Sequence, residues 1–305
     1  MKIDTLVFSG ASTKITLFIG ILRCLYEQRI LTPELEGIHT IYTCSISTLI
    51  VIYMLLGLSL DVMEHCCMQG NFENLINLDE INITGLVDNF GLVSNELLGT
   101  LVINLLKEKF NREDMTLQEL YEYKPICLSV KCANISKNKI DYINHTTDPD
   151  LSIITLLRMT TAIPFLFKPV IYKGDMYLDG GINGAYPVEK ATENYLGIWV
   201  RGNDSDSVEA DNLLSFMYKL GTLKQFDEQR LPRPNTIMCY SDIHFSNFTL
   251  SQETKQELIT LGYKTTLKHI QTHSLTNDLP TNDLPTNDLP TNDSLSEYRE
   301  DTTPT

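Results

Sequence analysis

The hydrophobic and polar positions near the N-terminus alternate between strand-like and helix-like patterns. Residues 3–8 form a short apolar run, and residues 15–28 then carry apolar side chains at helical spacing. A second apolar run covers 38–43, and a further apolar helix-like segment extends to about Leu56 before Gly57. Strand, helix, strand and helix in this order are typical of a parallel sheet covered by helices on both faces. We therefore predict an α/β protein with a three-layer α/β/α fold and a mostly parallel central sheet.

The rest of the chain continues this mixture of helices and strands. Apolar spacing predicts helices at 95–110, 115–123, 151–159 and 251–265, and it makes the segment 58–122 mostly helical. Other apolar runs predict strands at 125–133 and 139–144, a hairpin within 170–178, and core strands at 196–200 and 236–240. We expect the strands at 3–8, 38–43 and 196–200 to be central in one sheet, within a single domain over residues 1–270.

The last part of the chain has a different composition. From residue 276 the unit Thr-Asn-Asp-Leu-Pro occurs three times, and a further Thr-Asn-Asp follows. A proline at every fifth position excludes a helix, and the polar remainder buries too little surface to fold. We predict that residues 275–305 form a low-complexity, acidic, disordered tail.

Composition and charge exclude some classes of function. The 305 residues are 43% hydrophobic and 21% charged, which is typical of a globular protein, and the formal net charge is −15. A protein that binds nucleic acid needs a basic surface, so we expect no nucleic-acid partner. The seven cysteines are odd in number and show no metal-ligand spacing. They predict reduced thiols in a cytoplasmic or other intracellular reducing compartment, and no metal site.

Residues 40–60 carry no charged side chain and approach the length of a membrane span. Their first nine positions contain five serines and threonines, and the apolar part is limited to 49–60. A run of that length is more typical of a buried core helix, which we predict here. The N-terminus begins Met-Lys-Ile-Asp before a short strand and does not resemble a signal peptide.

Two segments carry residues suited to hydrolytic chemistry. Ser45 lies between the predicted strand at 38–43 and the helix after it, where the tight turn of an α/β hydrolase exposes its nucleophile. Asp179 ends another strand-like run and is followed by two glycines, which allow a sharp backbone turn. Each residue also has a structural interpretation, with Ser45 as a helix N-cap and Asp179 as part of an Asp-Gly turn.

A third candidate is the loop Gly10-Ala11-Ser12-Thr13-Lys14 between the first strand and the first helix. Small residues at this point allow backbone N–H groups to point at an anion. The loop lacks the spacing of a P-loop. Its structural interpretation is a plain connection between a strand and a helix.

These segments occur in the order found in the patatin-like phospholipase family, which the chain resembles over about residues 3–265. The resemblance rests on Leu-Val-Phe-Ser-Gly-Ala-Ser-Thr-Lys at 6–14, Tyr-Thr-Cys-Ser-Ile-Ser-Thr-Leu at 42–49, Ala-Ile-Pro-Phe-Leu-Phe-Lys-Pro-Val at 162–170 and Tyr-Leu-Asp-Gly-Gly-Ile-Asn at 177–183. The run at 162–170, followed by Asp-Gly-Gly, is the most specific part of the resemblance.

The resemblance implies a lipid acyl hydrolase, a phospholipase A-type esterase whose catalytic dyad contains no histidine. Ser45 would be the nucleophile and Asp179 the general base. The backbone N–H groups of Gly10, Ala11 and Ser12 would form the oxyanion hole. The implied substrate is a phospholipid or another acyl-ester lipid, reached through peripheral membrane contact, and no cofactor or metal is implied.

The chain departs from the family pattern at several glycines. The family's oxyanion loop is glycine-rich, but Ala11, Ser12 and Ile15 occupy three of its glycine positions here. Thr43 and Ser47 replace the glycines that flank the nucleophile. Side chains are costly at left-handed backbone positions. The alternative prediction is therefore a catalytically weakened or inactive patatin-fold protein that binds a lipid or a protein partner. A third is an interaction protein that acts through its tail.

Overall fold

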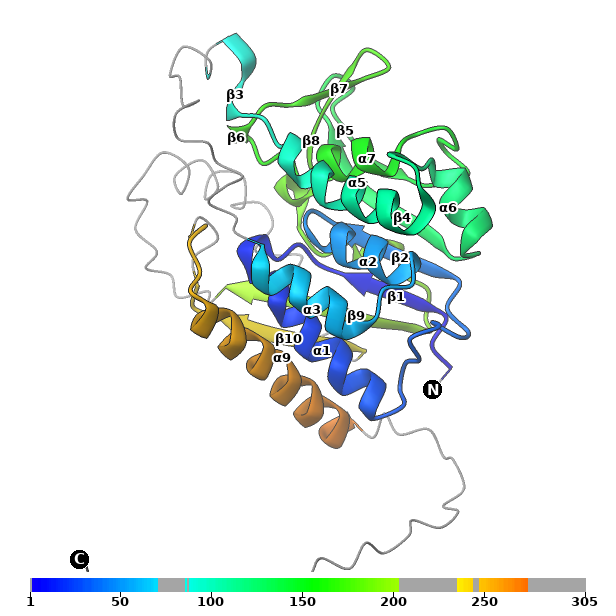
Figure 1. The fold of residues 1–305 in the computed structure, drawn as a ribbon, viewed down its shortest axis with the longest axis vertical. Helices are drawn as coiled ribbons and strands as arrows, with labels where there is room; N and C mark the ends of the chain where they lie inside the picture. Colours follow the sequence, from blue (N-terminus) through cyan, green and yellow to red (C-terminus); the bar gives the residue numbers. More distant parts are fainter. Residues whose placement is uncertain (1, 71–85, 87, 203–234, 244–246, 274–305) are drawn as a thin grey trace, which may run out of the picture.

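The computed structural model describes residues 2–70, 86, 88–202, 235–243 and 247–273 (Figure 1). The tail predicted at 275–305 lies outside the described residues. The same is true of 71–85, which belong to the segment predicted to be mostly helical.

A mixed sheet, eight-stranded within the described residues, passes through the centre of the molecule. Its parallel part contains, in spatial order, β10 (Thr236–Ser241), β9 (Tyr195–Gly202), β1 (Thr5–Phe8), β2 (Thr40–Cys44) and β4 (Cys127–Asn134). The strands β5 (Lys139–Ile143) and β8 (Asp175–Asp179) pair antiparallel with β4, and β7 (Val170–Tyr172) pairs antiparallel with β8. The predicted α/β class, with a mostly parallel central sheet, is confirmed.

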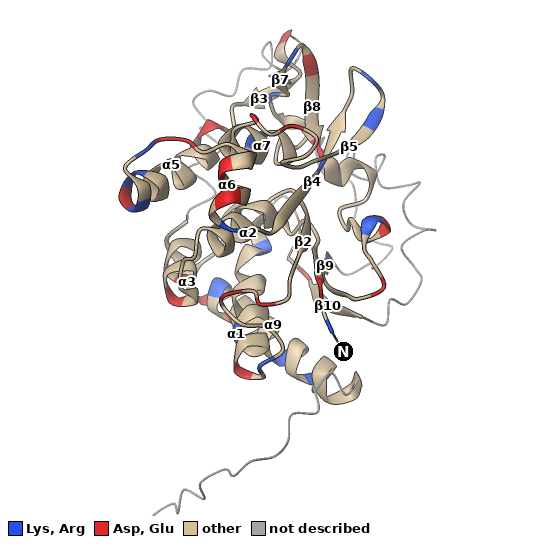
Figure 2. Cartoon of the chain, turned by 90° about the vertical axis from the view of Figure 1, so that its right-hand side faces the viewer, with Lys and Arg blue, Asp and Glu red and all other residues tan. Residues whose placement is uncertain are grey.

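The helices surround this sheet in an order that follows the chain. They are α1 (Thr16–Glu27), α2 (Ser47–Leu55), α3 (Leu60–Gln69), α5 (Glu96–Phe110), α6 (Leu117–Tyr123), α7 (Ile153–Thr160) and α9 (Gln252–His273). Helix α9 packs on α1 and β10, while α7 packs on β4, β8 and α5. Figure 2 shows α1, α2, α3 and α5 on the same side of the sheet.

The alternation of side chains along β1 divides the core between the two faces of the sheet. Leu6 and Phe8 belong to the main hydrophobic cluster, with the helices. Val7 points to the other face, as the period of two in a strand requires, and packs with Tyr186 and Trp199. The short 3-10 helix η5 (Val188–Lys190) follows Tyr186, and its first residue packs against this smaller cluster. All three β1 side chains have no exposed surface, so β1 is buried on both faces.

Helices α1 and α9 meet through glycines. A Cβ atom placed on Gly262 would lie 2.3 Å from the Leu17 carbonyl oxygen, and one placed on Gly20 would lie 1.9 Å from the Ile259 carbonyl oxygen. Real Cβ atoms do not come this close to backbone, because the atoms would overlap. The sequence pattern placed a helix at 251–265, and the structure extends it to His273 with this close contact near its middle.

We expect Gly262→Ala to destabilise the protein by about 1–3 kcal/mol, because the added methyl group forces the α1 and α9 backbones apart. Chemical denaturation measures this loss as a lower free energy of unfolding. The matched control is Gly202→Ala, because a Cβ atom there would meet no atom within 4 Å. Equal stabilities of the two variants would contradict the tight helix contact.

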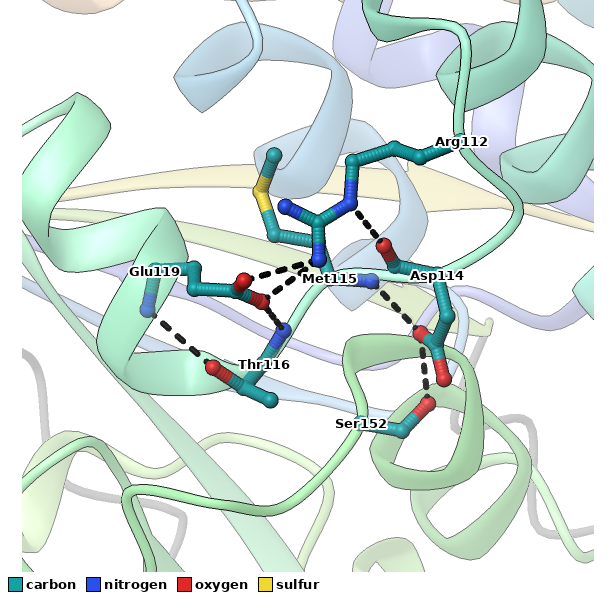
Figure 3. Close-up of polar contacts among 6 residues, drawn as sticks. All are labelled: Arg112, Asp114, Met115, Thr116, Glu119 and Ser152. Atoms are coloured by element: carbon teal, nitrogen blue, oxygen red, sulfur yellow. Dashed lines mark hydrogen bonds and ion pairs between the residues drawn. The ribbon is translucent and has the colours of Figure 1, made fainter.

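A polar network fixes the starts of α6 and α7 (Figure 3). Thr116 and Glu119 form a capping box, in which the Thr116 hydroxyl accepts the Glu119 N–H and the Glu119 carboxylate accepts the Thr116 N–H. Arg112 donates to both carboxylate oxygens of Glu119. Asp114 accepts a hydrogen bond from Ser152 Oγ at 2.8 Å, and Ser152 caps α7. The network therefore fixes the start of the helix whose last residue belongs to the site described below.

Two short strands were missed by the sequence pattern. β3 (Gly91–Val93) lies in the segment predicted as mostly helical, and it pairs in parallel with β6 (Phe165–Phe167). Three residues are too few to show a period of two. The prediction of a buried helix after residue 47 is confirmed, because every residue of α2 is buried. None of the helices in the described part of the chain has the length and apolar character that a membrane span requires.

Candidate active site

Ser45 occupies the turn between β2, which ends at Cys44, and α2, which begins at Ser47. Its φ angle is 60°, in the left-handed region that costs a residue with a side chain about 1–2 kcal/mol. The Ser45 N–H donates to Thr160 Oγ1 at 2.8 Å, which helps hold this conformation. The N-cap interpretation is wrong: the N-cap residue of α2 is Ile46, and no side chain caps the helix.

Asp179 is the last residue of β8, and both of its carboxylate oxygens are hydrogen-bonded. Oδ2 accepts the Ser45 hydroxyl at 2.6 Å, across 134 positions in the sequence, and Oδ1 accepts the Gly181 N–H at 2.7 Å. The second bond is the Asp-Gly turn of the structural interpretation, so the turn and the contact with Ser45 coexist. Only 5% of Asp179 is exposed.

The sheet explains why residues so distant in sequence meet. In the pairing of β2 with β4, Cys44 lies opposite Lys131. In the pairing of β4 with β8, Asp179 lies opposite Cys132. The ends of β2 and β8 therefore reach neighbouring positions of the same central strand, β4, from its two sides.

Burial decides the charge state of the Asp179 carboxyl. It raises the pKa of Asp179 to about 6, although hydrogen bonds from Ser45, Gly181 and Cys44 and the positive charge of Lys131 lower it. A carboxylate with a pKa close to neutral pH is ionised and still basic enough to accept a proton. The position of this pKa suits the exchange of a proton with Ser45.

The loop at 10–12 lies against Ser45. A Cβ atom placed on Gly10 would lie 3.3 Å from the Cβ atoms of both Ser45 and Ala185, so glycine permits this close approach. The Gly10 N–H donates to the Ala185 carbonyl at 2.8 Å. Of the two residues that replace family glycines here, Ser12 has a left-handed φ of 51°, whereas Ala11 has an ordinary φ of −138°. The expected backbone cost of a side chain therefore applies to Ser12 and not to Ala11.

Two residues of the site were missed by sequence reasoning. Thr160, the last residue of α7, accepts the Ser45 N–H and donates to the Lys131 carbonyl at 2.9 Å. Lys131 is buried in the middle of β4. The available signals were a charged residue inside an otherwise uncharged strand at 125–133 and a Thr-Thr pair directly before the run at 162–170.

The cysteines and potential metal ligands complete the survey of reactive groups. The seven cysteines are free thiols, as predicted, and five of them are buried. Within the described ranges, no group of three or more histidines, cysteines, aspartates or glutamates has the arrangement of a metal site. Cys44 lies beside the site, and burial raises its thiol pKa well above the usual value, so the thiol is protonated.

Solved structures with the same fold include two bacterial proteins. VipD from Legionella pneumophila superposes with a TM-score of 0.63 at 14% identity, over 90% of this chain and 67% of that one. The type III effector protein ExoU superposes with a TM-score of 0.52 at 15% identity. The match with ExoU covers 90% of this chain and 54% of that one, so this chain spans about half the length of ExoU.

Relatives in sequence come from two viruses. An uncharacterized protein of Acanthamoeba polyphaga mimivirus is 21% identical over 286 residues, which is 88% of this chain and 94% of that protein. A probable lipid hydrolase of Invertebrate iridescent virus 6 is 26% identical over 223 residues, or 72% of each chain. The sequence model of the patatin-like phospholipases matches residues 6–192, a segment that contains Ser45, Asp179 and the loop at 10–12. The chain therefore belongs to the patatin-like phospholipase family.

Proposed function

We propose that this protein hydrolyses acyl esters of lipids, with Ser45 as the nucleophile and Asp179 as the general base. The observation that carries the proposal is the 2.6 Å hydrogen bond from Ser45 Oγ to the buried Asp179 carboxylate, at a strand-to-helix turn. Membership of the patatin-like phospholipase family and the similarity to a probable viral lipid hydrolase support a lipid as the substrate.

The proposed reaction needs one proton acceptor and one nucleophile. Asp179 takes the hydroxyl proton as Ser45 Oγ attacks the ester carbonyl, and a tetrahedral oxyanion forms. The oxyanion collapses, the C–O bond to the alcohol breaks, and the alcohol leaves with the proton from Asp179. Water then repeats these steps on the acyl-serine, with Asp179 again as the base, and releases the fatty acid.

We propose that the loop at 10–12 supplies the oxyanion hole. Its position against Ser45 supports this role, because donors must lie close to the carbon that is attacked. The Gly10 N–H already donates to the Ala185 carbonyl, so an oxyanion would have to displace that carbonyl to use it. We therefore assign the stabilisation of the oxyanion first to the amides of Ala11 and Ser12. Gly10 contributes mainly by leaving space beside Ser45.

The replaced glycines beside the nucleophile favour the alternative of a non-catalytic binding protein. In this structure both replacements form hydrogen bonds in or next to the turn. Thr43 Oγ1 bonds with Thr48 Oγ1 at 2.9 Å, and Ser47 Oγ donates to the Cys44 carbonyl at 2.9 Å. These side chains fit the turn while Ser45 Oγ keeps its bond to Asp179, so we favour the hydrolase.

A fluorophosphonate probe tests the proposal directly, because it bonds covalently to an activated serine. We expect the purified full-length protein to be labelled at Ser45, as identified by peptide mass spectrometry. Ser45→Ala should abolish labelling, and the control Ser136→Ala, in the β4–β5 hairpin, should retain it. Release of fatty acid from phospholipid vesicles, compared with a soluble short-chain ester, tests whether the substrate is a lipid. A folded protein that stays unlabelled and inactive would support the binding protein instead.

A further inference from the structure

Lys131 is a buried cation whose three donors are all directed at one loop and its neighbour. Only 2% of its surface is exposed. Its Nζ atom donates to the carbonyl oxygens of Asn183 and Gly184 and to Glu189 Oε1, each at 2.9 Å. Burying an ammonium group costs several kcal/mol unless such partners compensate it. The loop that Lys131 binds begins directly after Asp179.

The backbone of the same residue connects to Ser45. The Lys131 carbonyl accepts the Thr160 hydroxyl, and Thr160 Oγ1 in turn accepts the Ser45 N–H. The loop after β8 also lies against this carbonyl, because a Cβ atom on Gly180 would be 2.4 Å from the Lys131 oxygen. Lys131 therefore contacts the loop after Asp179 directly and the turn of Ser45 through one threonine.

The surroundings of Asp179 contain few other charges. Glu189 from η5 faces Lys131 and also accepts the Tyr142 hydroxyl from β5. The thiols of Cys44 on β2 and Cys132 on β4 lie close to Asp179, and burial raises the pKa of both. Among the described groups, Lys131 is the cation that lowers the pKa of Asp179.

We propose that Lys131 is a positioning residue for hydrolysis, whose ammonium group fixes the loop at 181–184 and keeps the Asp179 carboxylate charged and aimed at Ser45. This inference rests on the proposed function. Lys131 is not proposed to touch the substrate, because its three donors are directed at protein oxygens.

The test compares Lys131→Met with Lys131→Arg over a range of pH. Methionine keeps most of the side-chain volume and removes the charge. We expect Lys131→Met to lower kcat by about 10–100-fold with a smaller change in KM, because the base is mispositioned. We expect it to move the acidic limb of kcat/KM to higher pH by about one unit, because a cation near the base is lost. Arginine keeps the charge and should leave the limb near its wild-type position.

The matched control is Lys255→Met. Lys255 is another buried lysine that donates to backbone carbonyls, those of Met68 and Gly70, on α3 and just after it. This variant should lose stability and leave the acidic limb unmoved. If Lys131→Met lowers activity only as far as its folded fraction falls, with an unmoved limb, Lys131 is a structural residue and the inference is wrong.

Two further measurements keep the inference testable. Glu189→Gln removes a charge from a half-exposed residue and should move the limb to lower pH, opposite to Lys131→Met; a shift in the same direction would oppose the inference. The second is the titration of the Asp179 carboxyl by carbon-13 NMR, assigned with Asp179→Asn. This readout needs no turnover. An inactive, unlabelled wild type would overturn the proposed function, whereas equal Asp179 titrations in wild type and Lys131→Met would overturn the inference alone.

Discussion

Asp179→Asn is expected to lower kcat/KM for an acyl ester by about 10²–10⁴-fold, because the asparagine amide cannot accept the Ser45 proton. The effect should be visible with a soluble ester and with phospholipid vesicles, since both reactions use the same base. The protein should remain folded, because the amide keeps the shape of the carboxylate and can still accept the Gly181 N–H that Oδ1 accepts now. Initial rates measured at several substrate concentrations give the two kinetic constants separately.

A double variant separates a dyad from two independent contributions. Ser45→Ala with Asp179→Asn should be scarcely less active than Ser45→Ala alone, because both changes disable the same step. Asp175→Asn is the matched control: it lies on the same strand, and its side chain forms an ion pair with Lys137. We expect Asp175→Asn to retain nearly full activity. Multiplicative losses in the double variant would show that Asp179 does not act through Ser45.

The same substitution is expected to stabilise the protein at pH 7 by about 1–3 kcal/mol, the amount that follows from roughly two pKa units at 1.36 kcal/mol each. Burial raises the pKa of Asp179 in the folded state from 3.8 to about 6. The folded protein thus binds this proton more tightly than the unfolded chain does. Above pH 6 the folded state holds a buried carboxylate at a cost in stability, and below about pH 4 that cost disappears. Asparagine carries no such cost at any pH.

The difference in unfolding free energy between Asp179→Asn and wild type should therefore shrink as the pH falls from 7 to 4. Chemical denaturation at each pH measures it. Asp175→Asn should show the opposite sign, because the ion pair with Lys137 lowers the pKa of Asp175 and stabilises its charged form. An Asp179→Asn variant that is less stable than wild type at pH 7 would show that the carboxylate is held without strain. The gain expected here is typical of active sites, which trade stability for function.

The local pattern of the sequence determined the elements near Ser45. The apolar run before it became β2, and the apolar run after it became the buried helix α2. The hairpins at 127–143 and 170–179 also follow from local patterns, because apolar and turn residues alternate there over short distances. The order of the motifs was sufficient to indicate the family and to single out Ser45 and Asp179 as candidates.

Only the tertiary structure decided how these candidates are arranged. The contact between Ser45 and Asp179 joins positions 134 residues apart, and it depends on both strands pairing with β4. The roles of Thr160 and Lys131 arise from the same central strand. The engagement of the Gly10 amide depends on a carbonyl 175 positions away, as the numbers of Gly10 and Ala185 show. Periodicity reports which face of an element is buried, but the partners of a buried polar group are set by neighbouring strands that local sequence does not encode.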